Sequence, residues 1–120
     1  MDVEQVVGET VASLREVVGS DWNAVAGFAD KQAKLLATQA AWIAESRVLG
    51  ALREDDELFD FFSQQLERMT LDFARSLSSL TLLTVEKAWN LVAGVLWKHV
   101  NLALGAAGLG PLPMPQAPAA

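Results

Sequence analysis

The sequence predicts an all-α protein, an antiparallel helical bundle of three to four long amphipathic helices, expected to be oligomeric and to end in a disordered tail rich in proline and alanine. Three observations support this fold class. Apolar residues recur at steps of three and four along most of the chain. Glycine, serine or acidic residues interrupt this pattern about once per helix length. All four prolines lie in the last ten residues, where no helix can continue.

Length and composition limit the possible functions. The 120 residues are expected to form one domain over residues 1–105, followed by a flexible tail over residues 106–120. The chain contains no cysteine, which excludes disulfides, thiolate metal ligands and a cysteine nucleophile. A net charge of -6 opposes binding to nucleic-acid phosphates. Acidic residues near the amino terminus do not resemble a secretory signal, so we expect a cytoplasmic protein.

The first predicted helix spans about residues 3–18. Its apolar row follows alternating steps of four and three: Val3, Val7, Thr10, Leu14 and Val17. Gly19 and Ser20 are expected to end this helix. Ser20 or Asp21 is then expected to cap a second helix that runs to about residue 52.

In the second helix, small and apolar residues share one face, which predicts tight packing against another helix. This face contains Ala29, Ala33, Leu36, Ala40, Ile43 and Gly50, with Arg47 in the same row. Gly27 could interrupt the helix, because an interior glycine costs about 1 kcal/mol relative to alanine. A turn is predicted at residues 53–56, where Asp55 or Asp56 can cap the next helix.

The third helix is predicted from about residue 58, with one apolar face and one polar face. The apolar row consists of Phe62, Leu66, Met69, Phe73, Leu77 and Leu80. Two interpretations of residues 76–84 remain open. The hydroxyl-rich stretch forms a turn in which Thr84 caps a fourth helix, or one helix of about 50 residues continues through it.

The last helical stretch, residues 88–108, is apolar around most of its circumference. Its polar and small residues form one narrow stripe: Lys87, Asn90, Gly94, Lys98, Asn101 and Gly105. A membrane-spanning helix is not expected, since Lys98 near the middle of the span would cost about 2.5 to 3.5 kcal/mol. Three explanations remain, namely a central core helix, an oligomer interface, or adsorption to a lipid or other apolar surface.

No motif in the sequence specifies a substrate, a cofactor or a metal. His99 is the only histidine, and we expect a structural or interfacial role for it. The Glu-x-x-His pairs of di-iron bundles do not occur, and the acidic run at residues 54–57 lacks the spacing of a calcium loop. The sequence therefore predicts no catalytic residues, no bound cofactor and no enzymatic activity.

The tail offers one weak docking pattern. Residues 115–118 spell Pro-x-x-P, and three apolar residues could anchor an extended segment in a partner groove: Leu109, Leu112 and Met114. The alternative is a disordered or extended tail without a partner.

The function expected from these patterns is that of a non-enzymatic helical assembly or scaffold protein. It would form a homo-oligomer or bind a helical partner through its apolar C-terminal helix, with these anchors: Trp89, Val92, Leu96, Trp97 and Val100. The alternative is a peripheral amphipathic coat protein on a lipid or granule-like apolar surface. An enzyme or ligand-binding bundle is a third possibility, which no motif supports.

Overall fold

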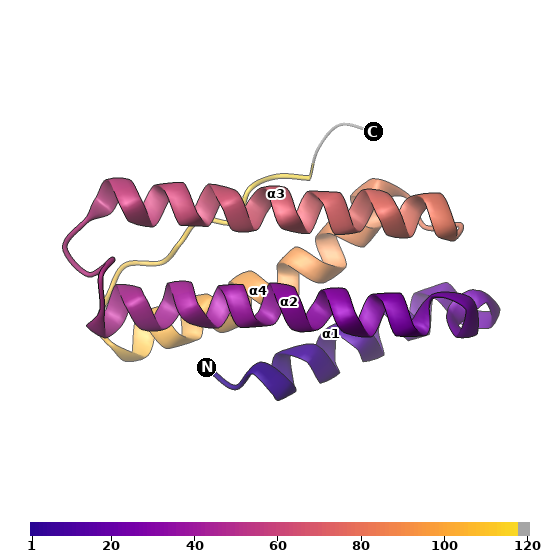
Figure 1. Ribbon diagram of the computed structural model, residues 1–120, viewed down its shortest axis with the longest axis horizontal. Helices are drawn as coiled ribbons and strands as arrows, with labels where there is room; N and C mark the ends of the chain where they lie inside the picture. Colours follow the sequence, from indigo (N-terminus) through magenta and orange to yellow (C-terminus); the bar gives the residue numbers. More distant parts are fainter. Residues whose placement is uncertain (118–120) are drawn as a thin grey trace.

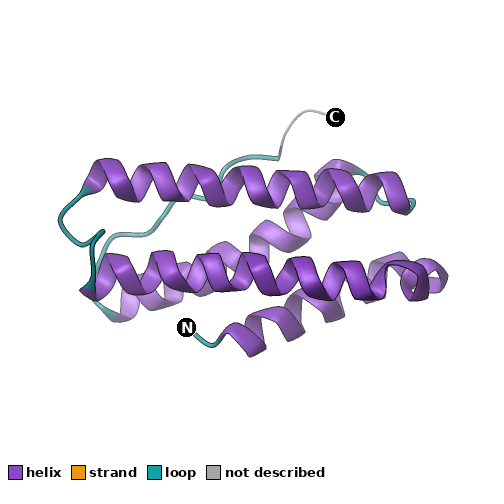
Figure 2. Cartoon of the chain, viewed as in Figure 1, coloured by secondary structure: helices purple, strands orange, loops and turns teal. Residues whose placement is uncertain are grey.

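The computed structural model describes residues 1–117, and this part of the chain folds into four α-helices (Figure 1). These are α1 (Val3–Val18), α2 (Trp22–Leu49), α3 (Asp56–Leu80) and α4 (Val85–Ala106). A single turn of 3-10 helix, Gly19–Asp21, joins α1 to α2. Figure 2 shows only helices and loops in the described residues. The predicted all-α bundle is thereby confirmed.

The four helices run up and down in a flattened bundle that measures 45 × 29 × 18 Å (Figure 1). Helix α4 packs against α1, α2 and α3, whereas α1 and α3 lie at opposite edges without touching. Helices α2 and α3 form the side nearest the viewer in Figure 1, with α4 behind them. Helix α2 likewise packs against α1, α3 and α4, so α2 and α4 are the two central helices. The position of α4 among its neighbours explains why the sequence makes it apolar on most sides.

Side-chain caps start three of the helices. Asp2 accepts from Gln5 N–H at α1, Asp55 from Leu58 N–H at α3, and Thr84 from Lys87 N–H at α4. Each cap satisfies an amide that has no partner within its own helix. The predicted capping roles of Asp55 and Thr84 are confirmed.

The junction between α1 and α2 differs from the expectation in one detail. Gly19 ends α1 with a φ of 68°, as a helix-stopping glycine does. Asp21, however, makes no side-chain cap to α2. The 3-10 turn carries the chain directly from one helix into the next, so the predicted side-chain cap at Asp21 is wrong.

Helix α2 is uninterrupted at Gly27 and ends at Leu49, three residues before the predicted end. The N–H of Gly50 donates to Ser46 O, and Leu52 then turns back into the core. Arg47 fixes this loop, because its guanidinium donates to Leu52 O at 2.8 Å and pairs with Asp56 at 2.9 Å. Leu52 is buried although it lies after the helix, so the apolar spacing in the sequence continued past Leu49 and the predicted end of the helix was too late.

The structure decides between the two interpretations of residues 76–84. Helix α3 ends at Leu80, and a turn over residues 81–84 leads into α4, so a single helix of about 50 residues is wrong. The Thr81 hydroxyl donates to Leu77 O and accepts from Leu83 N–H. A threonine hydroxyl that bonds to the backbone in this way competes with continued helix formation.

Residues 107–117 follow the bundle after α4. Asn101 holds this segment, because its side chain donates to Leu112 O at 3.0 Å and accepts from Leu112 N–H at 2.7 Å. Leu112 is buried against the chain's own core rather than in a partner. The flexibility predicted for residues 106–120 stays a prediction, and the Pro-x-x-P pattern ends outside the described residues.

None of the helices in the described part of the chain combines the length and the apolar character that crossing a bilayer requires.

Candidate interaction surface

The five residues predicted as interface anchors lie together on α4, inside the chain's own core. Each is at most 2% exposed: Trp89, Val92, Leu96, Trp97 and Val100. The rings of Trp89 and Trp97 are 6.2 Å apart between centroids, within the range of favourable aromatic pairs. Their contact with a partner stays a prediction, and it would require the bundle to open. A surface that is available in the folded chain must lie elsewhere.

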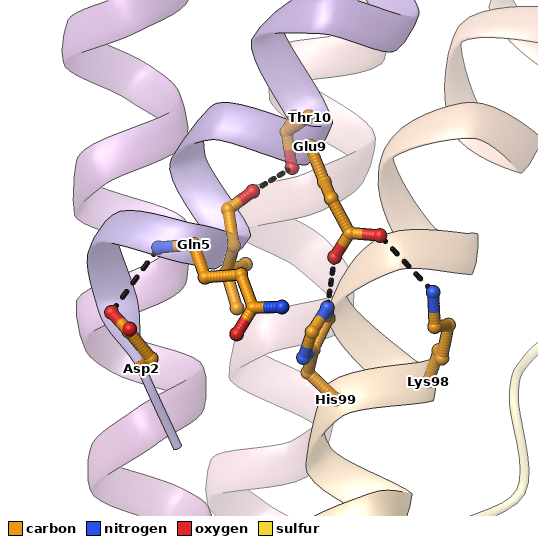
Figure 3. A network of polar contacts seen from close by, with 7 residues as sticks. Asp2, Gln5, Glu9, Thr10, Lys98 and His99 are labelled. Atoms are coloured by element: carbon orange, nitrogen blue, oxygen red, sulfur yellow. Dashed lines mark hydrogen bonds and ion pairs between the residues drawn. The ribbon is translucent and has the colours of Figure 1, made fainter.

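A polar cluster joins α1 to α4 (Figure 3). Glu9 lies between two α4 side chains, accepting from Lys98 Nζ at 3.1 Å through one oxygen and contacting His99 Nε2 through the other. The hydrogen bond with His99, followed by that with Lys98, lowers the pKa of Glu9 below its usual value of 4.5. His99 thus has a structural partner, and the cluster ties two helices together.

A cavity of about 200 Å³ lies between α3, α4 and the tail. Ser63, Trp97 and Leu112 contribute to its wall. Ser63 Oγ and Trp97 Nε1 are buried and make no hydrogen bond within the described residues. Typical ligand pockets measure about 300 to 1,000 Å³, so this cavity is small for a substrate.

A row of exposed apolar residues follows α2 and α3 on the side away from α4. We call this surface the α2/α3 face. Its residues on α2 are Phe28, Lys31, Leu35, Thr38, Trp42, Glu45 and Leu49, and those on α3 are Leu58, Phe61, Phe62 and Met69. Among them, Leu35 is 53% exposed, Trp42 42%, Leu49 83% and Phe61 58%. Exposed apolar residues grouped in this way typically mark an interaction site.

Three aromatic rings fix the middle of the α2/α3 face. Trp42 packs edge-on against Phe62 with ring centroids 4.8 Å apart, and Phe62 packs edge-on against Phe61 at 5.2 Å. Such contacts hold the rings in defined positions although they are partly exposed to water. The cluster is a fixed apolar surface that remains partly exposed to water.

Beside this cluster, the α2/α3 face is hollowed. A depression of about 410 Å³ lies next to Leu35, and Met69 of α3 forms part of its wall. Its other lining residues are Lys31, Lys34, Thr38 and Gln39. An apolar floor bordered by two lysines suits an apolar side chain that brings a negative charge with it.

Charge is unevenly distributed along the α2/α3 face. Lys31 and Lys34 border the depression at one end, where Arg68 and Asp72 of α3 add one charge of each sign. At the other end lies Glu45, followed by the exposed acidic run at residues 54–57. Arg53 and Arg47 offset part of this acidity, Arg47 through its pair with Asp56. The α2/α3 face therefore has a basic end and an acidic end.

The sequence contained a signal for the α2/α3 face. Phe28, Leu35, Trp42 and Leu49 are seven residues apart and fall on the side of α2 opposite its buried alanine row. In the structure, the alanine side of α2 is buried within the chain and the other apolar side stays exposed. The sequence contained no comparable signal for the contact of Glu9 with His99, because the two residues are 90 positions apart in the chain.

No protein-family model matches the chain, and the comparisons with curated proteins and with solved structures found no match either. The α2/α3 face and the buried core are therefore the basis on which a function can be inferred.

Proposed function

We propose that the chain is a non-enzymatic helical assembly or scaffold protein that self-associates or binds a helical partner through the α2/α3 face. The observation that carries this proposal is the row of Leu35, Trp42 and Leu49, exposed along the outer side of α2 and flanked by Phe61 of α3. Burying one such side chain contributes about 1.5 to 3 kcal/mol. A partner that covers this row removes these apolar side chains from water.

The shape of the α2/α3 face also favours a helical partner. Along α2, the row formed by residues 28, 31, 35, 38, 42, 45 and 49 advances by three and four residues alternately. This average step of 3.5 residues is the repeat by which two helices keep contact over their length. Helix α2 has 28 residues and is about 42 Å long. A face of this length, widened by α3, can supply the roughly 800 Å² per partner of a standard interface.

The first experiment measures the solution mass of the chain by light scattering over a range of protein concentrations. We expect an oligomer whose mass falls in Leu35→Gln and Phe61→Gln, because each variant places an amide in the apolar contact. Leu102→Gln is the matched control, since Leu102 is a similarly exposed leucine on α4. It should leave the mass unchanged.

An oligomer that is insensitive to Leu35→Gln and Phe61→Gln would place the interface elsewhere and contradict this proposal. A chain that stays monomeric would remove self-association and leave a helical partner as the occupant of the α2/α3 face. The coat-protein alternative has its own test, flotation with vesicles of zwitterionic lipid or with an oil emulsion. Binding there that depends on Leu35 would favour an apolar surface as the partner of the α2/α3 face. The cytoplasmic location stays a prediction.

A further inference from the structure

We infer that the occupant of the α2/α3 face is a second copy of the chain, with the two α2 helices antiparallel across a two-fold axis near Thr38 and Gln39. This inference rests on the proposed function and specifies its partner. It follows from three properties of the α2/α3 face: the placement of Trp42, the position of the depression, and the separation of charges.

The apolar features of the α2/α3 face are self-complementary about this axis. Leu35, beside the depression, and Trp42, in the aromatic cluster, lie equally far along α2 from the midpoint between Thr38 and Gln39. They are seven residues apart, which is about 10.5 Å along a helix. A two-fold axis at the midpoint therefore brings Trp42 of each copy opposite the depression of the other. Tryptophan seated in a partner's pocket is a common centre of binding energy.

The charges on the α2/α3 face agree with the same antiparallel arrangement. Lys31 and Glu45 lie on opposite sides of the axis at nearly equal distances, so Glu45 of each copy approaches Lys31 of the other. The acidic run at residues 54–57 is then directed toward the basic end of the second copy. A parallel pairing would instead bring Lys31 against Lys31 and Glu45 against Glu45. Charges of this kind select the orientation of paired helices.

Packing within one chain leaves the exposed row of α2, which includes Leu35 and Trp42, free to contact a second copy. The opposite side of α2 is occupied by the small residues that contact α4 and α1, including Ala33, Ala37 and Ala40, which are at most 2% exposed. Thr38 and Gln39 at the axis are polar, and a polar residue within an apolar seam fixes the register of two helices at a cost in stability. The second copy thus extends the bundle from one side without opening it.

Charge reversal tests the orientation directly. Glu45→Lys should weaken self-association on the order of tenfold, because two symmetry-related attractions become repulsions. The double variant Lys31→Glu with Glu45→Lys should restore it. Within one chain these residues are 14 positions apart, about 21 Å along the helix. Rescue therefore cannot arise inside a single copy. Glu16→Lys, the same charge change at an exposed site on α1, is the control and should have no effect.

Cross-linking provides a second measurement that does not depend on affinity. The natural chain contains no cysteine, so single-cysteine variants give an unambiguous result. A mixture of Lys31→Cys and Glu45→Cys chains should form disulfide-linked dimers on mild oxidation, whereas each variant alone should form few. Links within each separate variant, and no linked dimer in the mixture that contains one chain of each variant, would show a parallel pairing and overturn the inference.

The outcomes also separate this inference from the proposed function. If Leu35→Gln lowers the mass but the double charge variant fails to rescue association, the α2/α3 face is the interface and the antiparallel two-fold arrangement is wrong. If neither Leu35→Gln nor the charge variants change the mass, the proposed function is wrong as well.

Discussion

At the residue scale, the contact of Glu9 with His99 shows how a single histidine acquires a role through tertiary structure. His99 lies on the most apolar helix, and its side chain is only 10% exposed. A carboxylate can only accept a hydrogen bond, so His99 Nε2 carries the proton when Glu9 is ionised. The pair therefore links the edge helix α1 to the central helix α4 in addition to their apolar contact.

The lowered pKa of Glu9 leads to a pH-dependent prediction. This pKa is lower in the folded than in the unfolded chain. The ionised carboxylate therefore stabilises the fold at pH values above 4.5, the usual pKa of the group. This contribution is lost as the pH falls through the folded-state pKa. Urea unfolding measured from about pH 6 to about pH 3 should therefore show a smaller loss of stability for Glu9→Gln than for the natural chain.

Glu16→Gln, the same chemical change elsewhere on α1, is the control for this experiment and should retain the natural pH dependence. If Glu9→Gln and the natural chain lost stability in parallel, the contact with His99 and Lys98 would contribute nothing to folding.

At the element scale, local chemistry decides where each helix starts and stops. Thr84 is the clearest example, because its hydroxyl accepts from Lys87 N–H at 3.1 Å and marks the first turn of α4. Thr81 ends α3 a few residues earlier by bonding to its backbone. The apolar pattern is continuous through this stretch, but Thr81 ends α3 and Thr84 begins α4, so the chain forms two antiparallel helices.

Removal of the Thr84 cap should destabilise the protein measurably. Thr84→Ala is expected to lower the free energy of unfolding by about 1 kcal/mol, whereas Thr84→Ser keeps the hydroxyl and should lose much less. Chemical denaturation of both variants measures the difference. Equal losses for alanine and serine would contradict a capping role for the hydroxyl.

At the scale of the whole molecule, the important distinction is between apolar surface buried inside the chain and apolar surface left outside. Helices α2 and α4 each pack against the other three helices, but α2 also leaves a row of large apolar side chains exposed on its outer side. The same residue type therefore has opposite roles: Trp97 is 2% exposed on α4, and Trp42 is 42% exposed on α2.

This distinction can be tested with two leucines of α4. Leu96 is fully buried, so Leu96→Ala should lower the free energy of unfolding by about 2 to 5 kcal/mol through lost contacts and a cavity. Leu102 is exposed, so Leu102→Ala should change it by less than about 0.5 kcal/mol. Neither variant should alter the solution mass while the chain is folded. A reduced oligomer mass with unchanged stability in Leu96→Ala would place Leu96 between chains.

Much of the architecture followed from the sequence by itself. The spacing of apolar residues predicted three to four helices, and Gly19, Asp55 and Thr84 were among the residues predicted to end or begin them. These are local properties, because helical periodicity and capping depend on residues within one or two turns of each other. Whether residues 76–84 form a turn was decided only by the structure.

Only the tertiary structure decided which apolar surface is internal. The sequence directed attention to Trp89, Leu96 and Trp97, since α4 is the most apolar helix, but a helix surrounded by its neighbours needs that surface for its own core. The tertiary structure also decided that Glu9 contacts His99, and that Leu35 and Trp42 remain exposed on the surface of the bundle. Such contacts join residues far apart in the chain, so they depend on how the helices pack and not on the spacing within any one of them.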